Sequence, residues 1–160
     1  MQKLWRWGAL ALTVYWCFFI WHFSLAGAGE SAATSGRFLH LFNEALESAG
    51  SDFRFTGLTI RKTAHFVEFF ALGFLISLTL RLYRFPHVIP FALPCVFAVA
   101  TVDELLQFTS PGRGPALADV LLDTSGGICG ILVFFGLSLL TFWLQKRILV
   151  KKSKKLEKTT

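Results

Sequence analysis

The sequence predicts an all-α membrane protein, a four-transmembrane-helix bundle with both termini on the cytoplasmic side. Three observations support this prediction: the composition, the length of the apolar stretches and the distribution of basic residues. Of the 160 residues, 54% are hydrophobic and only 16% are charged, against about 25% charged in an ordinary soluble domain. A water-soluble fold of this length cannot bury so much apolar surface, so the composition indicates a chain embedded in lipid.

Four stretches are long and apolar enough to cross a bilayer, whose hydrocarbon core is spanned by about 20 residues of helix. They cover residues 7–26, 63–82, 88–108 and 117–144. The first follows Lys3 and Arg6 and ends at small residues, which is the outline of a signal peptide. Because the apolar region of a signal peptide is about 7–15 residues long, we expect this segment to be retained as a membrane span.

The basic residues orient these spans. Two Lys or Arg residues precede the first span, two lie between the second and third, and seven fall between Lys146 and Lys158. Since Lys and Arg concentrate in cytoplasmic loops, we expect both termini to be cytoplasmic in a multi-pass protein of the cell membrane. Residues 1–145 then form the transmembrane domain and residues 146–160 a basic cytoplasmic tail, which is expected to lie along an anionic leaflet or to be disordered.

The formal net charge of +6 does not indicate nucleic-acid binding. The basic residues flank the spans, and none of them belongs to a motif that binds RNA or DNA. The sequence therefore predicts membrane lipids as the surroundings of the chain, and no nucleic-acid partner.

The long connection between the first two spans is expected outside the cell. Its small residues at 28–36 indicate a flexible loop, whereas 37–49 has apolar residues at helical spacing and predicts an amphipathic helix on the outer surface, ended by Gly50. In the last span, Gly126, Gly127 and Gly130 predict close helix packing. If these glycines face lipid, they predict instead a contact with another membrane protein.

Acidic residues inside the spans are the main functional signal. Five of the ten in the chain lie within or at the ends of otherwise apolar stretches, namely Glu68, Asp103, Glu104, Asp119 and Asp123. Each ionisable group near the centre of a membrane helix costs at least about 2.5–3.5 kcal/mol, so such residues usually face the interior of a bundle and mark function.

Helical spacing gathers these residues on shared faces. Arg61, His65 and Glu68 are separated by four and three positions, as residues on one helix face are. Asp103 and Gln107 are four apart, and so are Asp119 and Asp123. Under the predicted topology all of them lie in the outer half of the membrane, with Arg113 in the turn between the last two spans. We therefore expect a polar pocket between spans two, three and four.

Three interpretations of this pocket are open. The charged residues can simply fasten three helices by ion pairs, although buried ion pairs contribute little net stability. They can bind an anionic ligand at the outer leaflet through charge-assisted hydrogen bonds. They can form a catalytic site, with His65, Glu68 and Asp103 as candidates to transfer protons, or with carboxylates and the histidine around a divalent cation.

The sequence has no HExxH pair, no Ser/His/Asp order and no phosphate-binding loop. We therefore assign no metal ligand and predict no cofactor, and whether the protein is an enzyme stays open. The candidate ligand-binding residues are Arg61, Lys62, His65, Glu68, Asp103, Glu104, Gln107, Arg113, Asp119 and Asp123.

These residues resemble the signature of the VanZ-like family of small bacterial membrane proteins. The resemblance rests on Arg61-Lys62-Thr63-Ala64-His65-Phe66-Val67-Glu68, on Asp103-Glu104-Leu105-Leu106-Gln107-Phe108, on Pro111-Gly112-Arg113 and on Asp119-Val120-Leu121-Leu122-Asp123. Trp21-His22-Phe23-Ser24 is similar to a weaker aromatic-Ser pattern of the family, except that Leu25 replaces the usual polar residue after the serine.

The resemblance implies an envelope protein of the bacterial cell membrane. The family takes its name from an accessory protein of glycopeptide resistance that favours resistance to teicoplanin, so a teicoplanin-type antibiotic resistance role is one expectation. On this basis the expected ligand is a cell-wall precursor or another lipid-linked anionic group, bound by Arg61, Lys62 and Arg113. The alternative is a membrane-embedded enzyme, metal- or acid/base-dependent, that acts on such a substrate.

The topology is tested with single cysteines in a variant that lacks Cys17, Cys95 and Cys129. We expect an impermeant thiol reagent to label Ser110→Cys in intact cells, because position 110 is predicted outside, and not to label Ser153→Cys. The reverse labelling would place the polar pocket on the cytoplasmic side.

Overall fold

The computed structural model describes residues 2–25, 28–109 and 116–157, and all regular secondary structure in these ranges is helical. The helices are α1 (Gln2–Ser24), α2 (Ala28–Ser48), α3 (Gly57–Leu82), α4 (Val88–Thr109) and α5 (Leu117–Glu157). α1, α3, α4 and most of α5 are long and apolar enough to cross a membrane. The predicted all-α fold with four candidate spans is confirmed, whereas the cytoplasmic placement of the termini stays a prediction.

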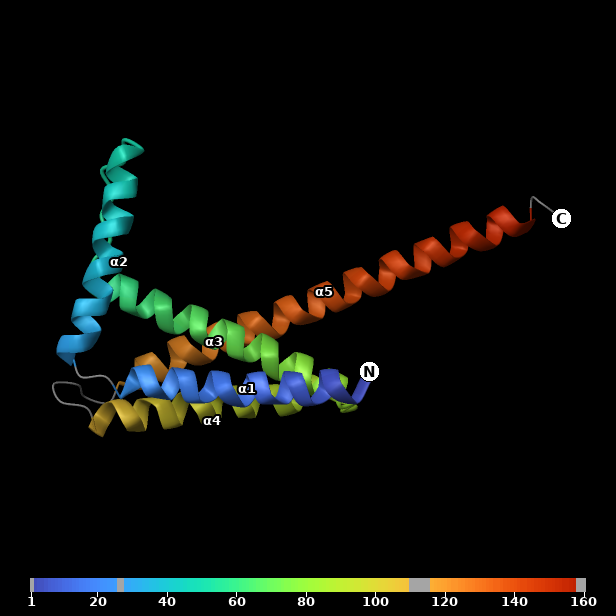
Figure 1. Ribbon diagram of the computed structural model, residues 1–160, viewed down its shortest axis with the longest axis horizontal. Helices are drawn as coiled ribbons and strands as arrows, with labels where there is room; N and C mark the ends of the chain where they lie inside the picture. Colours follow the sequence, from blue (N-terminus) through green and yellow to red (C-terminus); the bar gives the residue numbers. More distant parts are fainter. Residues whose placement is uncertain (1, 26–27, 110–115, 158–160) are drawn as a thin grey trace.

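The four spans lie side by side near the end of the molecule that carries α2, and α5 diverges from the others towards its C-terminus (Figure 1). α2 stands across the axes of the spans. The described start of α1 and the end of α5 point to the same end of the molecule, while α2 lies at the other. α3 contacts each of the other helices. We call the end where α1 and α4 finish and α3 and α5 begin the site end, because the candidate site residues lie there.

Glycines bring α3 and α5 into backbone contact. A Cβ atom at Gly126 would overlap the carbonyl oxygen of Phe66, and one at Gly130 would overlap the carbonyl oxygen of Phe70. From the other helix, a Cβ atom at Gly73 would overlap the backbone of Gly127. The predicted close packing is confirmed. The interpretation of these glycines as a lipid-facing contact for another protein is wrong, because Gly126, Gly127 and Gly130 are buried against α3 and α4 of the same chain.

α1 is joined to the bundle by side chains whose polar groups form hydrogen bonds with α3 and α4. The indole N–H of Trp16 donates to the carbonyl of Glu68 at 2.9 Å, and that of Trp21 donates to Val99 at 3.4 Å. The hydroxyl groups of Thr13 and Thr79 lie 2.9 Å apart. Such pairing matters within a membrane, where no water is present to satisfy these groups.

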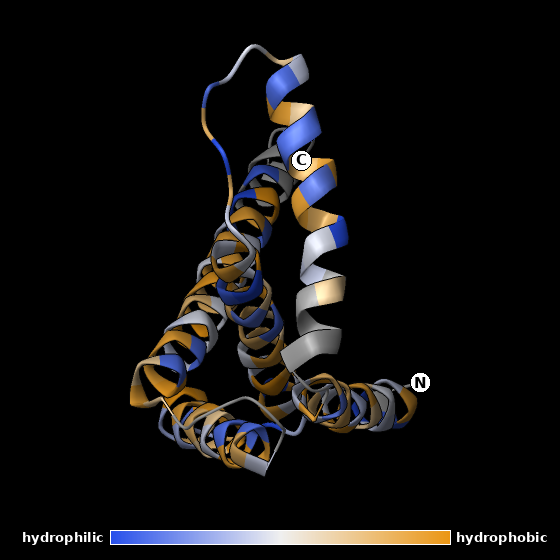
Figure 2. Ribbon diagram, turned by 90° about the vertical axis from the view of Figure 1, so that its left-hand side faces the viewer, coloured by the Kyte–Doolittle hydropathy of each residue, from blue (hydrophilic) through white to orange (hydrophobic). Residues whose placement is uncertain are grey.

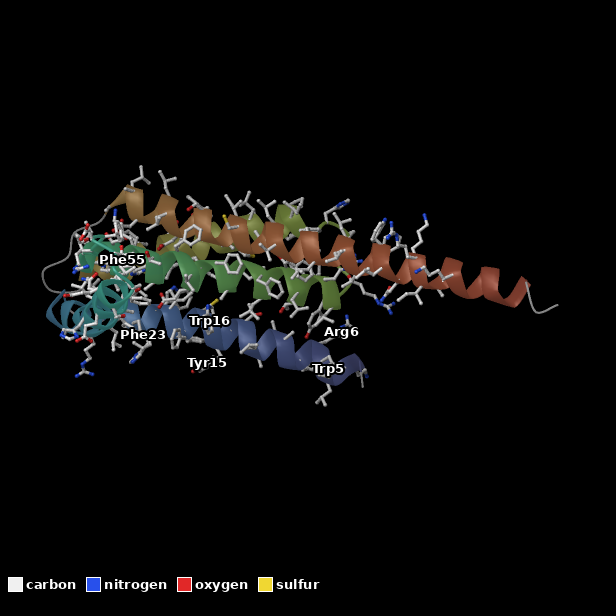
Figure 3. All side chains as sticks on the ribbon, turned by 90° about the horizontal axis from the view of Figure 1, so that it is seen from above. Trp5, Arg6, Tyr15, Trp16, Phe23 and Phe55 are labelled. Carbon is white, nitrogen blue, oxygen red and sulfur yellow. The ribbon has the colours of Figure 1, made fainter. Side chains whose placement is uncertain are left out.

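The outward faces of the spans are apolar. Figure 3 shows Trp5, Tyr15 and Phe23 along α1, with Tyr15 pointing away from the other helices. These side chains are 71%, 61% and 49% exposed, respectively. In a bilayer such faces contact lipid, which explains how a bundle can leave so many large apolar side chains uncovered.

α2 begins at Ala28, nine positions before the expected start at 37. The expectation of a flexible loop at 28–36 is therefore wrong. Three of these nine residues are alanine, the residue with the highest helix propensity, and they extend the amphipathic helix towards the N-terminus. Figure 2 shows hydrophilic and hydrophobic residues alternating along α2, which crosses the direction of the spans as a helix on a membrane surface would.

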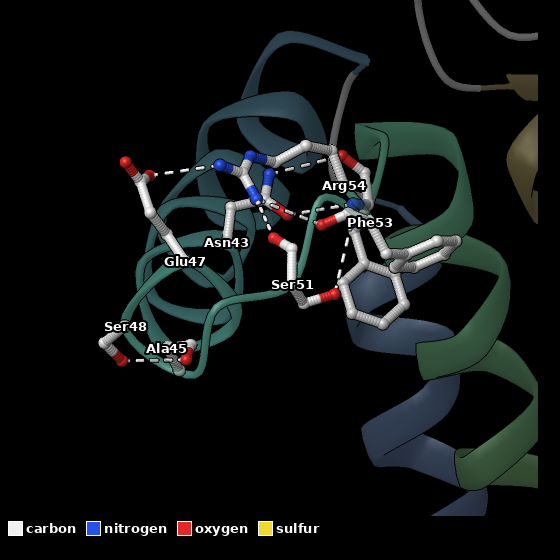
Figure 4. A network of polar contacts seen from close by, with 8 residues as sticks. Asn43, Ala45, Glu47, Ser48, Ser51, Phe53 and Arg54 are labelled. Carbon is white, nitrogen blue, oxygen red and sulfur yellow. Dashed lines mark hydrogen bonds and ion pairs between the residues drawn. The ribbon is translucent and has the colours of Figure 1, made fainter.

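The connection from α2 to α3 folds back on α2 (Figure 4). Gly50, at a φ of 75°, ends the helix as predicted. The side-chain amide of Asn43 then accepts from the backbone N–H of Phe55 at 2.8 Å and donates to its carbonyl at 3.3 Å. Arg54 lies 3.2 Å from the carboxylate of Glu47. These contacts fix the point at which the chain enters α3.

α3 and α5 also differ from the sequence expectation at one boundary each. α3 begins at Gly57 rather than 63, because the hydroxyl group of Thr56 caps the helix by accepting from the N–H of Thr59 at 3.1 Å. Arg61 and Lys62 are therefore inside the helix. α5 continues to Glu157, so the expectation of a disordered basic tail is wrong up to that residue, whereas its placement along an anionic leaflet stays a prediction.

The α3–α5 contact predicts a difference between two glycine-to-alanine changes in α5. Gly130→Ala should destabilise the protein by about 1–3 kcal/mol, the usual cost of overpacking. Gly136→Ala is the control, because its added methyl group meets no atom within 4 Å. The measurement is thermal unfolding of the purified protein in detergent, and equal melting temperatures for the two variants would contradict the packing described.

Candidate functional site

Polar side chains from three spans meet at the site end of the bundle. α3 and α5 contribute residues from their first turns, and α4 contributes residues from its last turns. Successive spans run in opposite directions. The starts of α3 and α5 and the end of α4 therefore lie at the same end of the bundle. Of the predicted site residues, Arg113 lies outside the described residues, and the other nine lie on these three helices.

His65 is at the centre of the cluster. Its Nδ1 atom lies 3.8 Å from Oδ2 of Asp103 on α4 and 3.7 Å from Oδ1 of Asp123 on α5. Asp103 is 0% exposed and Asp123 is 1% exposed. One imidazole and two buried carboxylates from three different helices are thus brought together.

Gln107 joins Arg61 to this cluster. Its side-chain amide donates to Oδ2 of Asp103 at 2.8 Å, and its carbonyl oxygen accepts from Nη2 of Arg61 at 3.2 Å. Gln107 is 2% exposed. The amide group therefore orients Asp103 and fixes one edge of the guanidinium group at the same time.

Lys62 and Asp119 form the more exposed part of the site. Nζ of Lys62 lies 3.5 Å from Oδ1 of Asp119, and their side chains are 46% and 27% exposed. Asp119 is in the first turn of α5, where a carboxylate is also favoured by the partial positive charge of the helix N-terminus. This pair lies at the rim of the site, whereas Asp103 and Asp123 lie at its base.

Glu104 contacts the start of the last span, and it does not belong to the group of side chains around His65. Its Oε1 atom accepts a short hydrogen bond from the backbone N–H of Ala116, immediately before α5. Glu104 is 7% exposed. The carboxylate thus ties the end of α4 to the beginning of α5.

The site contains more carboxylates than fixed cations. Glu68 lies one turn deeper than His65 on α3, and it acts electrostatically on Asp123 together with Asp103, Glu104 and Asp119. Arg61 and Lys62 are the permanent cations of the described part of the site. Five acidic groups therefore accompany two permanent positive charges and one histidine, at a depth where an ionised group is expensive.

A small cavity lies among these residues. It encloses about 80 Å³ and is lined by Leu58, Arg61, Lys62, His65, Gln107, Asp119, Leu122 and Asp123. A second, larger hollow of about 310 Å³ is lined by Leu58, Thr59, Lys62, Thr63, Phe66 and Leu122. We call them the polar cavity and the groove. They share Leu58, Lys62 and Leu122, so the groove between α3 and α5 adjoins the polar cavity.

The sequence did not reveal how α1 supports the site. Trp16 donates to the carbonyl of Glu68, Trp21 donates to the carbonyl of Val99, one turn before Asp103, and Ser24 is 2% exposed. These contacts place α1 behind the α3 and α4 residues that form the cluster. Trp16 and Trp21 could have indicated these contacts from the sequence, because a buried indole N–H requires a hydrogen-bond acceptor.

Comparison with known families gives a match to the family model described as VanZ/LLP1, over residues 9–142. This range covers more than half of the chain and includes α3 and α4 whole, with most of α1 and α5. No curated protein and no solved structure matches the chain.

The position of Glu104 predicts different effects of two substitutions. Glu104→Leu should lose about 1.5–3 kcal/mol, because it removes a hydrogen bond to a charged acceptor and leaves the N–H of Ala116 unsatisfied. Glu104→Gln keeps an acceptor oxygen of the same size and is the matched control. Thermal unfolding in detergent measures both, and equal stabilities would show that the Glu104–Ala116 contact does not hold α5.

Proposed function

The chain belongs to the VanZ/LLP1 family, and we propose that it is an envelope membrane protein that binds a lipid-linked anionic ligand at the outer leaflet. The observation that carries this proposal is the junction between the polar cavity and the groove. A ligand with a charged head and an apolar tail can occupy the two spaces together.

The head of the ligand occupies the polar cavity. Arg61 and Lys62 line this cavity, and Lys62 is half-exposed. A phosphate or carboxylate group accepts charge-assisted hydrogen bonds from such cations, and the planar guanidinium group can bind two oxygen atoms at once. The carboxylate of Asp119 keeps Lys62 oriented until the ligand arrives, and Gln107 does the same for Arg61.

The size of the polar cavity limits what can enter. The cavity encloses about 80 Å³, which is ample for a few water molecules. A single phosphate or carboxylate group can take their place. The remainder of a cell-wall precursor would then stay outside the cavity, in the aqueous phase or at the membrane surface.

The tail of the ligand lies in the groove between α3 and α5. Leu58, Phe66 and Leu122 supply apolar surface there, and Leu58 is 62% exposed. In a bilayer this face is in contact with lipid, so an amphiphile can enter sideways without leaving the membrane. Burial of apolar chain against protein in place of lipid adds little affinity, and the charged head therefore provides most of the specificity.

Ligand binding is expected to be visible with a long-chain polyprenyl phosphate as the probe and the wild type in lipid nanodiscs. Lys62→Gln should weaken binding about tenfold or more, because a hydrogen bond to a charged group contributes about 1.5–3 kcal/mol. Lys146→Gln is the matched control, since it removes the same charge at the far end of α5. An equal loss in both variants would show that the probe responds only to net charge.

An altered response to glycopeptides is the expected cellular consequence, since these antibiotics act on cell-wall precursors at the same leaflet. We expect the wild type, expressed in a susceptible Gram-positive host, to raise the inhibitory concentration of teicoplanin more than that of vancomycin. Asp119→Asn, at matched membrane levels, should lose this effect because Lys62 loses its partner. No change with the wild type would remove the resistance role from the proposal.

A further inference from the structure

The buried base of the polar cavity has the composition of a metal site. His65, Asp103 and Asp123 each offer one ligand atom, and these three atoms lie within 4.8 Å of one another. We propose that they bind a divalent metal ion. This site is separate from the phosphate-binding role of Arg61 and Lys62 and does not depend on it.

The distances between His65 and the two carboxylates are closer to those of ligands around one metal ion than to those of direct hydrogen bonds. Nδ1 of His65 is 3.7 Å from Asp123 and 3.8 Å from Asp103, and both separations exceed the length of a hydrogen bond. Tetrahedral coordination with bonds of about 2.0–2.2 Å places neighbouring ligand atoms about 3.3–3.6 Å apart. Shifts of a few tenths of an ångström would therefore bring the His65 contacts to the spacing of ligands on one ion.

Asp123 supplies an independent observation. Its Oδ1 atom, the one directed at His65, is buried and has no hydrogen-bond partner among the residues that the structure describes. A buried carboxylate oxygen that accepts no hydrogen bond is costly, and His65 at 3.7 Å offsets this cost only when the imidazole is protonated. A cation between Asp123 and His65 removes this cost.

The surroundings of Asp103 have the arrangement expected around a metal ligand. Gln107 donates to Oδ2 of Asp103 at 2.8 Å, and Arg61 in turn donates to Gln107 at 3.2 Å. Hydrogen bonds of this kind hold a carboxylate ligand in its coordinating orientation. Glu68 and Glu104 bring further carboxylates near Asp123, and a bound cation would offset their mutual repulsion.

The ligand set indicates the class of metal. The imidazole nitrogen favours Zn²⁺ or Fe²⁺ over Mg²⁺ and Ca²⁺, which prefer oxygen ligands alone, and the two carboxylates also suit Mn²⁺. His65 and Asp123 line the polar cavity, whereas Asp103 does not. The ion is thus enclosed by protein on one side and open to the cavity on the other, where a water molecule or an anionic oxygen completes its coordination.

The test measures Mn²⁺ binding to the full-length wild type, purified without a polyhistidine tag and stripped with a chelator. Electron paramagnetic resonance reports free Mn²⁺, and competition with Zn²⁺ and with excess Mg²⁺ reports selectivity. We expect one tightly bound ion per chain, displaced by Zn²⁺ and not by Mg²⁺. Asp123→Asn should lose about 100-fold or more in affinity, and Gln107→Leu about 10–100-fold, as for outer partners of metal ligands.

Two controls separate ligation from general attraction. His40→Gln removes an imidazole that lies 3.1 Å from Glu44 on the surface of α2, so it should leave the affinity unchanged. Asp119→Asn removes a carboxylate one turn from Asp123 without removing a ligand, so it should cost much less than Asp123→Asn.

The wild-type measurement decides the proposal without relying on the folding of any variant. Absence of stoichiometric Mn²⁺ or Zn²⁺ binding would overturn it and would mean that protons neutralise the buried carboxylates. Equal losses in Asp119→Asn and Asp123→Asn would overturn it as well, since they would show non-specific attraction. Circular dichroism and thermal unfolding of each variant establish that an observed loss belongs to the site and not to the fold.

Discussion

The cost of placing charge inside a membrane is the constraint on which the rest of this structure depends. Asp103 and Asp123 are buried on helices whose membrane-spanning parts carry mostly apolar side chains. Neither can face lipid, so each must be turned towards a helix that offers a compensating group. His65 on α3 faces both. The rotation of α4 and α5 about their own axes is thereby fixed, and their apolar faces are left to the lipid.

Packing between glycines sets the distance at which this compensation acts. Gly126 touches the backbone at Phe66, the residue that follows His65, and Gly126 itself lies three positions after Asp123. The closest approach of α3 and α5 therefore comes within one turn of the His65–Asp123 contact. A larger residue at 126 would separate the backbones, and the imidazole and the carboxylate would move apart with them. Gly126 thus sets the helix spacing that allows Asp123 to reach His65.

The site has a graded chemistry from base to opening. Buried carboxylates and the histidine lie deepest, Arg61 and Lys62 line the cavity above them, and Leu58 and Leu122 lead from it into the groove. A cation at the base and an anionic head in the cavity are compatible, because each neutralises the other in a region of low dielectric constant. α1 adds to this arrangement by packing behind α3 and α4 through Trp16 and Trp21.

The sequence by itself determined the spans and the faces of the helices. A bilayer of fixed thickness imposes the length of an apolar helix, and the helical period then places Arg61, His65 and Glu68 on one face. The sequence also identified the three ends of spans that carry the polar residues of the site. Only the tertiary structure decided the partners: Arg61 contacts Gln107 rather than a carboxylate, Lys62 takes Asp119, and His65 lies between Asp103 and Asp123. Spacing along one helix cannot give the rotation and height of its neighbours, which depend on the glycine contacts and on the burial of charge. The starts of α2 and α3 differ from the prediction for another reason: they follow from helix propensity and from capping by Thr56, which belong to the local sequence but which hydropathy does not register.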